Sequence, residues 1–260
     1  MMAPVTLQAV NVVKEFGPRS ARHRALDGVS LSVTEGQRIG IVGESGSGKS
    51  TISRIMVGLN TATSGSVEYA GLPISAVLRS RTRRLEFRRD VQYIAQDTSS
   101  SFDPRRTLLD AVVAPLRNLR GLDKREAERT ALDTIVRLEL DPSLAYRYPS
   151  QVSGGQRQRF ALALGLVVRP RILLCDEVVS ALDVSVQGAI LNLIKSYCLE
   201  SGAGLVFVSH GLPATAFIAD ELIVMNKGKI VEAGKSGEVL AAPADPYTAK
   251  LVRAHTGRAA

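Results

Sequence analysis

The stretch GESGSGKST, residues 43–51, constrains the fold of this chain more than any other segment. It fits the pattern G-x-x-x-x-G-K-[ST], follows the apolar run RIGIV, and opens a segment that has helical signals up to about Gly58. By chance the pattern arises in a chain of this length on the order of once in a hundred. A glycine-rich turn without function is therefore a poor explanation, and the sequence predicts an α/β fold built around a phosphate-binding loop.

The residue types in this loop suit a nucleoside triphosphate and Mg²⁺. Glycines let backbone N–H groups approach the phosphates, and the start of the helix adds positive potential. We expect Lys49 on the β and γ phosphates, the hydroxyl of Ser50 on Mg²⁺, and the hydroxyl of Thr51 close to the phosphates. The predicted phosphate-binding residues are Gly43, Glu44, Ser45, Gly46, Ser47, Gly48, Lys49, Ser50 and Thr51.

A second chemical pattern is RILLCDE, residues 171–177, in which four apolar residues lead into two adjacent acids. Such a run is typical of a buried parallel strand whose carboxyl end opens on the phosphate crevice. Asp176 is then expected to hold Mg²⁺, and Glu177 to act as general base toward the attacking water. Many strands end in an acid, so this interpretation depends on Lys49 and Ser50 upstream.

Three further polar residues follow or flank predicted strands. Gln96 closes VQYIAQ and His210 closes GLVFVSH, and both strands are expected to run into the same crevice. There Gln96 would reach Mg²⁺ or the water and His210 the γ-phosphate, although each also fits an ordinary surface position. Asp183, in SALD, fits a helix cap as well as a functional role.

The stretch VSGGQRQR, residues 152–159, has the form of a second anion-binding helix start. Ser153 is a predicted N-cap, Gly154 and Gly155 leave the backbone accessible, and an apolar helical run follows. The chain therefore carries two predicted phosphate-binding helix starts about a hundred residues apart, and the binding of one nucleotide does not explain both.

Charge and length limit the remaining functions. A formal charge of +8 over 260 residues is compatible with nucleic acid, anionic lipid or a phosphate-bearing ligand. The densest basic patch, residues 79–90, is interpreted as a solvated helix face. Its arginines are Arg79, Arg81, Arg83, Arg84, Arg88 and Arg89. Only Phe87 accompanies them as an aromatic, so no nucleic-acid partner is expected.

Membrane insertion and cysteine chemistry are not expected. No apolar run reaches the roughly 18 residues of a membrane span, and the N-terminus lacks the pattern of a signal peptide, which predicts a soluble cytoplasmic chain. Cys175 and Cys198 match no metal or redox spacing and are expected to be small buried hydrophobes.

Hydrophobic periodicity predicts strands at both ends of the chain and helices in the middle. Residues 6–16 and 29–33 are expected to be strands, and residues 124–140 a helix with its apolar face on Ala127, Ala131, Leu132, Ile135, Val136 and Leu138. After residue 170, apolar strands alternate with helices, and a hairpin with its turn at residues 226–228 follows.

Taken in order, six motifs resemble those of one family. GESGSGKST, Gln96, VSGGQ, RILLCDE, SALD and His210 are similar to the P-loop, Q-loop, signature, Walker B, D-loop and switch histidine of an ABC-type ATPase, over nearly the whole chain. The resemblance implies one ABC ATPase domain over residues 1–260, with a mostly parallel sheet and an N-terminal antiparallel β subdomain. The nucleotide-binding core would comprise residues 1–86 and 169–260, the helical signature subdomain 87–168, and a short C-terminal tail 235–260.

The resemblance also implies a division of labour between two subunits. Ser153, Gly154, Gly155 and Gln156, together with Asp183, would complete the site of a second ABC ATPase, either another chain or a second copy, while ATP and Mg²⁺ bind at the first. Phe16 resembles the aromatic that stacks on adenine, although an aromatic near a strand end is more often plain packing. The helical subdomain would dock on a membrane permease.

Finer resemblance points to one branch of the family. SSSFDPRRTLLDAV, RYPSQVSGGQRQR and DPYTAKLV are similar to segments of the ATPase subunits of dipeptide, oligopeptide and nickel importers, and more to the second of their two ATPases. This implies a peripheral position on the cytoplasmic face of the membrane and, indirectly, an extracellular solute-binding protein. Departures from the family at Thr98, Val152, Val178 and Gly211 remove no reactive group. The alternative is a soluble ABC-type subunit associated with phosphonate cleavage.

Overall fold

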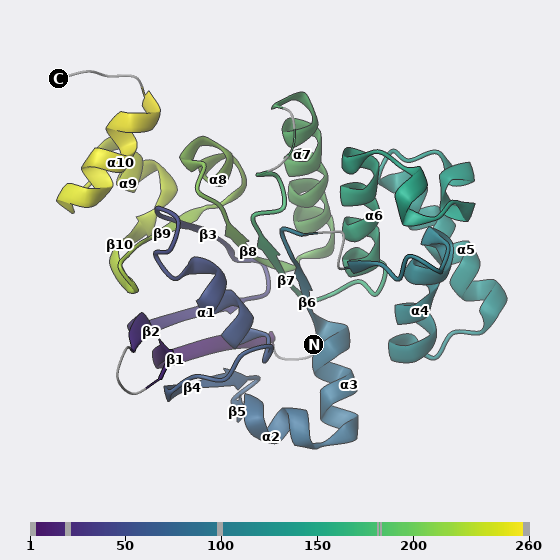
Figure 1. Ribbon diagram of the computed structural model, residues 1–260, viewed down its shortest axis with the longest axis horizontal. Helices are drawn as coiled ribbons and strands as arrows, with labels where there is room; N and C mark the ends of the chain where they lie inside the picture. Colours follow the sequence, from purple (N-terminus) through teal and green to yellow (C-terminus); the bar gives the residue numbers. More distant parts are fainter. Residues whose placement is uncertain (1–3, 19–21, 98–100, 181, 183, 257–260) are drawn as a thin grey trace.

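The computed structural model describes residues 4–18, 22–97, 101–180, 182 and 184–256 (Figure 1). A four-stranded antiparallel sheet has the order β2-β1-β4-β5. Its strands are β1 (Thr6–Phe16), β2 (His23–Thr34), β4 (Ser64–Tyr69) and β5 (Leu72–Pro73). In β1 the alternate residues Leu7 and Ala9 are fully buried while the opposite face is more open, because only one face of this sheet is covered.

The second sheet has six strands in the order β10-β9-β3-β8-β7-β6. They are β3 (Arg38–Val42), β6 (Val91–Ile94), β7 (Ile172–Asp176), β8 (Gly204–Val208), β9 (Glu221–Asn226) and β10 (Lys229–Lys235). All neighbouring pairs are parallel except the hairpin of β9 and β10. The mostly parallel core, the antiparallel subdomain and the hairpin turn agree with the sequence prediction.

Two hydrophobic cores lie on opposite faces of this sheet. Successive side chains of β7 alternate between them: Leu173 and Cys175 pack with the helical side, and Ile172 and Leu174 with α1 (Lys49–Met56) and the antiparallel sheet. Every residue of β7 and of β8 is buried as a result. Such continuous burial explains why both strands read as unbroken apolar runs in the sequence.

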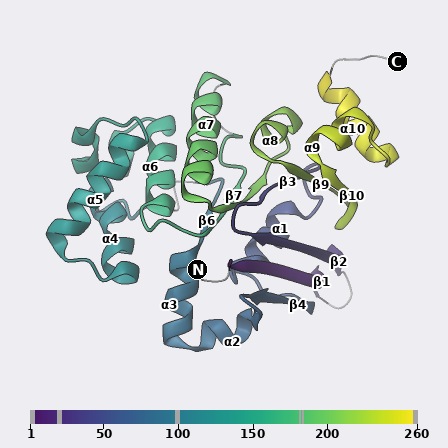
Figure 2. The same ribbon diagram turned by 180° about the vertical axis from the view of Figure 1, so that it is seen from behind.

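The helical subdomain projects from the β6 side of the sheet, away from the antiparallel sheet (Figures 1 and 2). It contains α4 (Leu108–Arg120), α5 (Lys124–Arg137), the short 3₁₀ turns Pro142–Tyr146 and Pro149–Gln151, and α6 (Gly154–Leu166). Local capping fixes its helix starts, with Thr107 and Asp110 forming a reciprocal capping box before α4 and Asp123 capping α5. The predicted apolar face of α5 is confirmed at Ala127 and Ile135, whereas Val136 is 54% exposed.

The predicted start of this subdomain at residue 87 is wrong. Residues 91–94 form β6, which pairs with β7 in the large sheet, and Phe87 is fully buried in the core beneath that sheet. The strand itself was predicted, but its partner β7 lies about 80 residues later, and local sequence does not show that the two strands pair.

The arginine-rich segment forms α2 (Ile74–Arg79) and α3 (Arg81–Asp90). Its early arginines are exposed, as predicted for a solvated face. The last turn differs, because the guanidinium of Arg88 donates a hydrogen bond to the Val57 carbonyl and that of Arg89 pairs with the buried carboxylate of Asp90. The Arg88 bond joins α3 to the end of α1, and the Tyr69 hydroxyl, which donates to Asp90 at 2.9 Å, joins α3 to β4.

Four further helices follow β7 along the chain. α7 (Val184–Ser201) precedes β8, α8 (Leu212–Ile218) follows it, and α9 (Ser236–Ala241) and α10 (Pro246–Thr256) come after β10. Lys235 belongs to β10, and residues 236–256 pack on the core through Val239 and Leu251, so this region is more than a tail. Among the described helices, none is long and apolar enough to cross a membrane. Cys175 and Cys198 are buried free thiols whose pKa values are raised by burial, which confirms their structural role.

Candidate nucleotide site

The loop between β3 and α1 has the shape that the glycine spacing predicted. Gly43, Gly46 and Gly48 all have positive φ angles, of 154°, 80° and 105°. A Cβ on Gly43 would lie 2.1 Å from the Met225 carbonyl oxygen, and one on Gly48 would lie 2.6 Å from that of Ala25. At Gly43 and Gly48, larger residues are therefore disfavoured both by backbone conformation and by close packing, and at Gly46 by conformation.

Lys49, the first residue of α1, is 4% exposed. Its ammonium donates hydrogen bonds to the carbonyl oxygens of Gly43 at 2.8 Å and Glu44 at 2.9 Å, so it lies inside the loop. Burial lowers the pKa of Lys49, and the nearby carboxylates of Glu177 and Asp176 act in the opposite direction. A cation held in a loop of backbone groups is suited to a polyanionic ligand.

The end of β7 meets α1 through the carboxylate of Asp176, which is 2% exposed. The hydroxyl of Ser50 donates to its Oδ1 at 2.8 Å, and the hydroxyl of Tyr93 donates to its Oδ2 at 2.6 Å. Two residues 126 positions apart in the sequence are thus in direct contact, which brings together the predicted Mg²⁺ ligands Ser50 and Asp176.

Glu177 follows β7 with a φ of 51°, a left-handed conformation that is uncommon for a residue with a side chain. Its backbone N–H donates to the Val208 carbonyl at 2.9 Å, which anchors it to β8. The Nδ1 atom of His210, two residues beyond β8, lies 3.7 Å from Glu177 Oε2. The pairing of β7 with β8 therefore places the predicted base beside the predicted switch histidine.

Gln96 lies just beyond β6, and its side-chain amide donates to the Ser180 hydroxyl at 3.2 Å. Ser180 in turn donates to the Glu177 carbonyl at 2.9 Å. Gln96 thus contacts the loop that carries Glu177. Among the described residues, its side chain makes this hydrogen bond and none to Asp176.

The signature stretch starts α6. Ser153 and Gln156 form a reciprocal capping box: the Ser153 hydroxyl accepts from the Gln156 N–H at 3.2 Å, and the Gln156 side chain accepts from the Ser153 N–H at 2.9 Å. Among the described residues, a Cβ on Gly154 would meet no atom within 4 Å, and one on Gly155 would lie 3.4 Å from Val186. The predicted N-cap is confirmed.

The sheet order separates this stretch from the P-loop of the same chain. α6 packs on β6, and β8 and β7 stand between β6 and the P-loop strand β3, which spans roughly 14 Å at the usual strand spacing. Gly154 instead shares a small cavity of about 220 Å³ with Gln96 and Glu177.

The other predicted residues lie apart from this cluster or outside the described parts of the chain. Phe16 ends β1, is 43% exposed, and has the Lys14 ammonium 4.8 Å from its ring centroid. Val178 is buried, and Gly211 occupies the N-cap position of α8. Asp183 and Thr98 lie outside the described residues.

The residues present fit a nucleotide phosphate chain and Mg²⁺. The Ser47 hydroxyl in the P-loop is buried and has no hydrogen-bond partner among the described residues, so these residues leave a donor of the loop unused. Ser50 and Asp176 supply adjacent hydroxyl and carboxylate oxygens, the ligand types that Mg²⁺ prefers.

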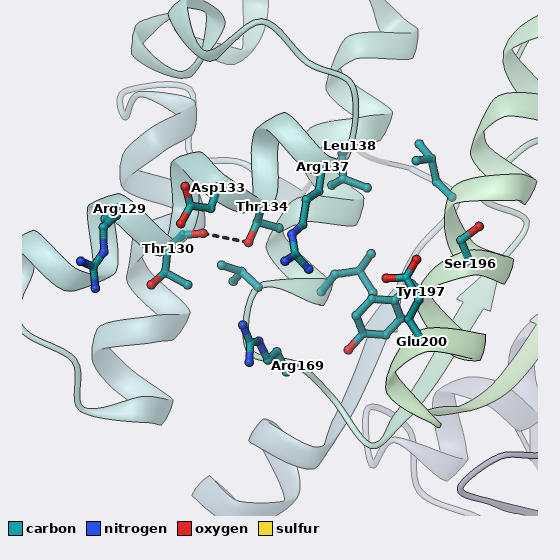
Figure 3. A pocket seen from close by; sticks show the side chains of 13 residues that line it. Arg129, Thr130, Asp133, Thr134, Arg137, Leu138, Arg169, Ser196, Tyr197 and Glu200 are labelled. Carbon is teal, nitrogen blue, oxygen red and sulfur yellow. Dashed lines mark hydrogen bonds between the residues drawn. The ribbon is translucent and has the colours of Figure 1, made fainter.

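A larger cavity, about 720 Å³, lies elsewhere, between α5 and α7 (Figure 3). Arg129, Arg137 and Arg169 line it together with Asp133 and Glu200. The C-terminal half of α7 and the residues that precede β7 form its wall, so it lies at the amino ends of β7 and β8. The predicted site residues lie at the carboxyl ends of these strands, and the larger cavity is therefore a separate feature.

Two tyrosines in the site were missed by the sequence prediction. Tyr93 lies inside VQYIAQ, where an aromatic in a strand signals only packing. Tyr247 belongs to DPYTAKLV in α10, and its hydroxyl accepts a hydrogen bond from the Glu44 N–H in the P-loop at 2.8 Å. Nothing in the local sequence indicates either partner, because each contact depends on strand or helix packing across a large sequence separation.

Mg²⁺ is expected to raise the ATP affinity of the Tyr93→Phe variant by about tenfold less than it raises that of the wild type. The reason is that Asp176 loses the hydroxyl that orients its carboxylate. The measurement is ATP affinity with and without Mg²⁺. Tyr69→Phe is the matched control. The Tyr69 hydroxyl donates a 2.9 Å hydrogen bond to the carboxylate of Asp90, and this contact lies away from the site. An equal effect of both substitutions on the Mg²⁺ dependence would contradict a local role for Tyr93.

Comparisons with known proteins agree with this geometry. The sequence pattern of the ABC transporter family matches residues 26–180. The chain is 40% identical over 231 residues to a probable peptide ABC transporter ATP-binding protein of Sinorhizobium fredii, covering 89% of this chain and 65% of that protein. It is 39% identical over 232 residues to the oligopeptide transport ATP-binding protein OppF of Escherichia coli, covering 89% and 69%.

Solved structures give the same fold. The dimeric structure of MJ0796, a bacterial ABC transporter cassette, superposes with a TM-score of 0.80 at 30% identity, covering 88% of this chain and 98% of that one. CbiO1 of Clostridium perfringens superposes with a TM-score of 0.76 over 97% of this chain. The resemblance that the six motifs indicated is confirmed, and the chain belongs to the ABC transporter family.

Proposed function

We propose that this chain binds ATP with Mg²⁺ and hydrolyses it to energise a membrane importer of peptides or related small solutes. The observation that carries the proposal is the hydrogen bond from Ser50 to Asp176, which unites the P-loop helix with the carboxylate end of β7 and sets Glu177 next to the same point. Relatives named as peptide and oligopeptide transport ATP-binding proteins support the choice of solute.

Each residue of the cluster has a distinct task in hydrolysis. Lys49 and the P-loop N–H groups bind the phosphates, and Glu177 accepts the proton of the water that attacks the γ-phosphate. His210, 3.7 Å from Glu177, contacts the γ-phosphate and positions the base. Ser50 and Asp176, with a contribution from Gln96, would hold Mg²⁺, which would supply positive charge to the phosphates.

The signature stretch acts on a second ATPase subunit. Two strands separate it from its own P-loop strand, and its helix start exposes Gly154 with free space around it. Helix starts with accessible glycines bind anions, so Ser153, Gly154, Gly155 and Gln156 suit a γ-phosphate held by another P-loop. Asp183 joins this contact, and Phe16, whose ring is partly exposed, stacks on adenine.

The assembly then comprises two ATPase subunits on the cytoplasmic face of a membrane, two permease subunits, and an extracellular solute-binding protein that acts through the permease. The decisive experiment reconstitutes the chain in vesicles with the permease and ATPase proteins encoded by neighbouring genes. It measures ATP-dependent uptake of a labelled peptide. Uptake that requires ATP and Glu177 supports the proposal. ATP hydrolysis without uptake of any peptide would overturn the importer assignment. Neighbouring genes that encode phosphonate-cleavage proteins would overturn it as well.

A further inference from the structure

The C-terminal helix reaches the P-loop. The hydroxyl of Tyr247, in the first turn of α10, accepts a hydrogen bond from the backbone N–H of Glu44 at 2.8 Å, across 203 positions of sequence. Tyr247 lies beyond residues 26–180, the part of the chain that matches the family pattern. A segment outside that pattern therefore touches the phosphate-binding loop directly.

Tyr247 is held in place by a chain of polar contacts. The carboxylate of Glu232 in β10 accepts from the N–H groups of Ala244 and Asp245 at 2.9 and 3.0 Å. The carboxylate of Asp245 accepts from the Tyr247 N–H at 2.8 Å, as an N-cap does. The next residue, Thr248, is fully buried, so α10 starts at a fixed point above the core.

Apolar packing ties the same helix to the strand that leads into the loop. Leu251 of α10 and Val42, the last residue of β3, belong to one buried cluster together with Val239. Val42 directly precedes Gly43, whose Cα is held against the Met225 carbonyl. Both ends of the first P-loop turn are therefore in contact with the C-terminal third of the chain.

The peptide groups of Glu44 connect Tyr247 with Lys49. The N–H of Glu44 bonds Tyr247, while its carbonyl accepts from the Lys49 ammonium at 2.9 Å and from the Ser47 N–H at 3.2 Å. Burial raises the pKa of Tyr247, so its hydroxyl is neutral at physiological pH and serves as a hydrogen-bond acceptor. Any rotation of the Glu44 backbone would move the cation that binds phosphate.

We propose that Tyr247 is a positioning residue for the P-loop, which fixes the Glu44 backbone so that Lys49 and the loop N–H groups are already arranged for the nucleotide. Pre-arranged groups bind a ligand more tightly because less conformational freedom is lost on binding. This inference rests on the ATP binding proposed above, and its effect is on affinity rather than on the proton transfer at Glu177.

The test compares wild-type protein with Tyr247→Phe, which keeps the ring and removes the hydroxyl. We expect the dissociation constants of ATP and ADP to rise by about threefold to tenfold, the usual worth of one hydrogen bond. The factor should be the same with and without Mg²⁺, unlike the effect of Tyr93→Phe. In the nucleotide-free protein, amide hydrogen exchange at Glu44 should become faster, a readout that does not depend on ATP.

Tyr69→Phe is the matched control, because it also removes a tyrosine hydroxyl from a 2.9 Å hydrogen bond but lies far from the loop. It should lower thermal stability without altering nucleotide affinity or exchange at Glu44. Unchanged affinity and unchanged exchange in a folded Tyr247→Phe protein would overturn the proposal. Faster exchange at Glu44 in Tyr247→Phe, together with a wild-type protein that binds no ATP, would instead refute the proposed function and leave the contact intact.

A second variant separates positioning from loss of structure. Asp245→Ala removes the cap that sets the start of α10, and it should weaken ATP binding by shifting Tyr247. In the Tyr247→Phe background the same change should add little, because the hydroxyl through which it acts is already absent. Fully additive effects of the two substitutions would contradict a shared route through Glu44.

Discussion

The Glu177→Gln variant is expected to bind ATP with near wild-type affinity and to hydrolyse it about 100- to 10,000-fold more slowly, the range for loss of a general base. Glutamine has the same shape and keeps the backbone bond from residue 177 to Val208, so the end of β7 should not move. What is lost is the carboxylate that lies 3.7 Å from His210 and would accept the proton of water. Phosphate release at saturating ATP measures the effect.

The same variant reports on the second subunit. With hydrolysis blocked, excess ATP and Mg²⁺ should accumulate any ATP-bound dimer, and its solution mass tells whether a second copy of this chain is a sufficient partner. Glu200→Gln serves as control, since Glu200 is an exposed carboxylate at the separate cavity between α5 and α7. A Glu177→Gln protein with wild-type hydrolysis would show that another group is the base.

The Lys49→Met variant is expected to lose about 100-fold in ATP affinity and yet to be more resistant to unfolding, by about 1 kcal/mol. The affinity falls because the phosphates lose their buried cation. The folded chain gains stability because an ammonium that is 4% exposed, with carbonyl partners, is replaced by an apolar side chain of similar length. Nucleotide titration and urea unfolding without nucleotide measure the two effects.

The lowered pKa of Lys49 fixes the pH dependence of this stability difference. Between the folded-state pKa and the usual value of 10.5, the unfolded chain binds more protons than the folded one, so the stability of the wild type rises with pH in that window. The advantage of Lys49→Met should therefore be complete at neutral pH and shrink as the pH rises through that window. Lys195→Met is the control, because the Lys195 ammonium bonds the Phe217 carbonyl far from the loop. A less stable Lys49→Met protein would mean that the carbonyl bonds outweigh the cost of burial.

The parts of the fold that the sequence predicted are those with local signals. The P-loop, the start of α6 and the acidic end of β7 each depend on neighbouring residues, through glycine φ angles, an N-cap and a run of apolar side chains. Ser50 and Asp176 are in contact because β3 and β7 end at one edge of the sheet and α1 begins just after β3. Their role as Mg²⁺ ligands stays a prediction.

The contacts that were missed depend on packing between distant segments. β6 was predicted as a strand but assigned to the helical subdomain, because its pairing with β7 joins residues about 80 positions apart. Tyr93 and Tyr247 were not recognised because a tyrosine hydroxyl has no fixed partner in sequence, and its acceptor or donor lies 83 or 203 positions away. The Gln96–Ser180 contact likewise joins two loops that only the sheet order brings together.

The position of β8 has a consequence for how the protein is made. β8 lies between the P-loop strand β3 and the Asp176 strand β7, although the ribosome synthesises it after both. A nascent chain that ends before Gly204 has the P-loop and both acidic residues, but it lacks the strand that bridges them and the Val208 carbonyl that holds Glu177. The helical subdomain, whose contacts are local, is expected to form first, and the ability to bind nucleotide should appear late in synthesis as one step.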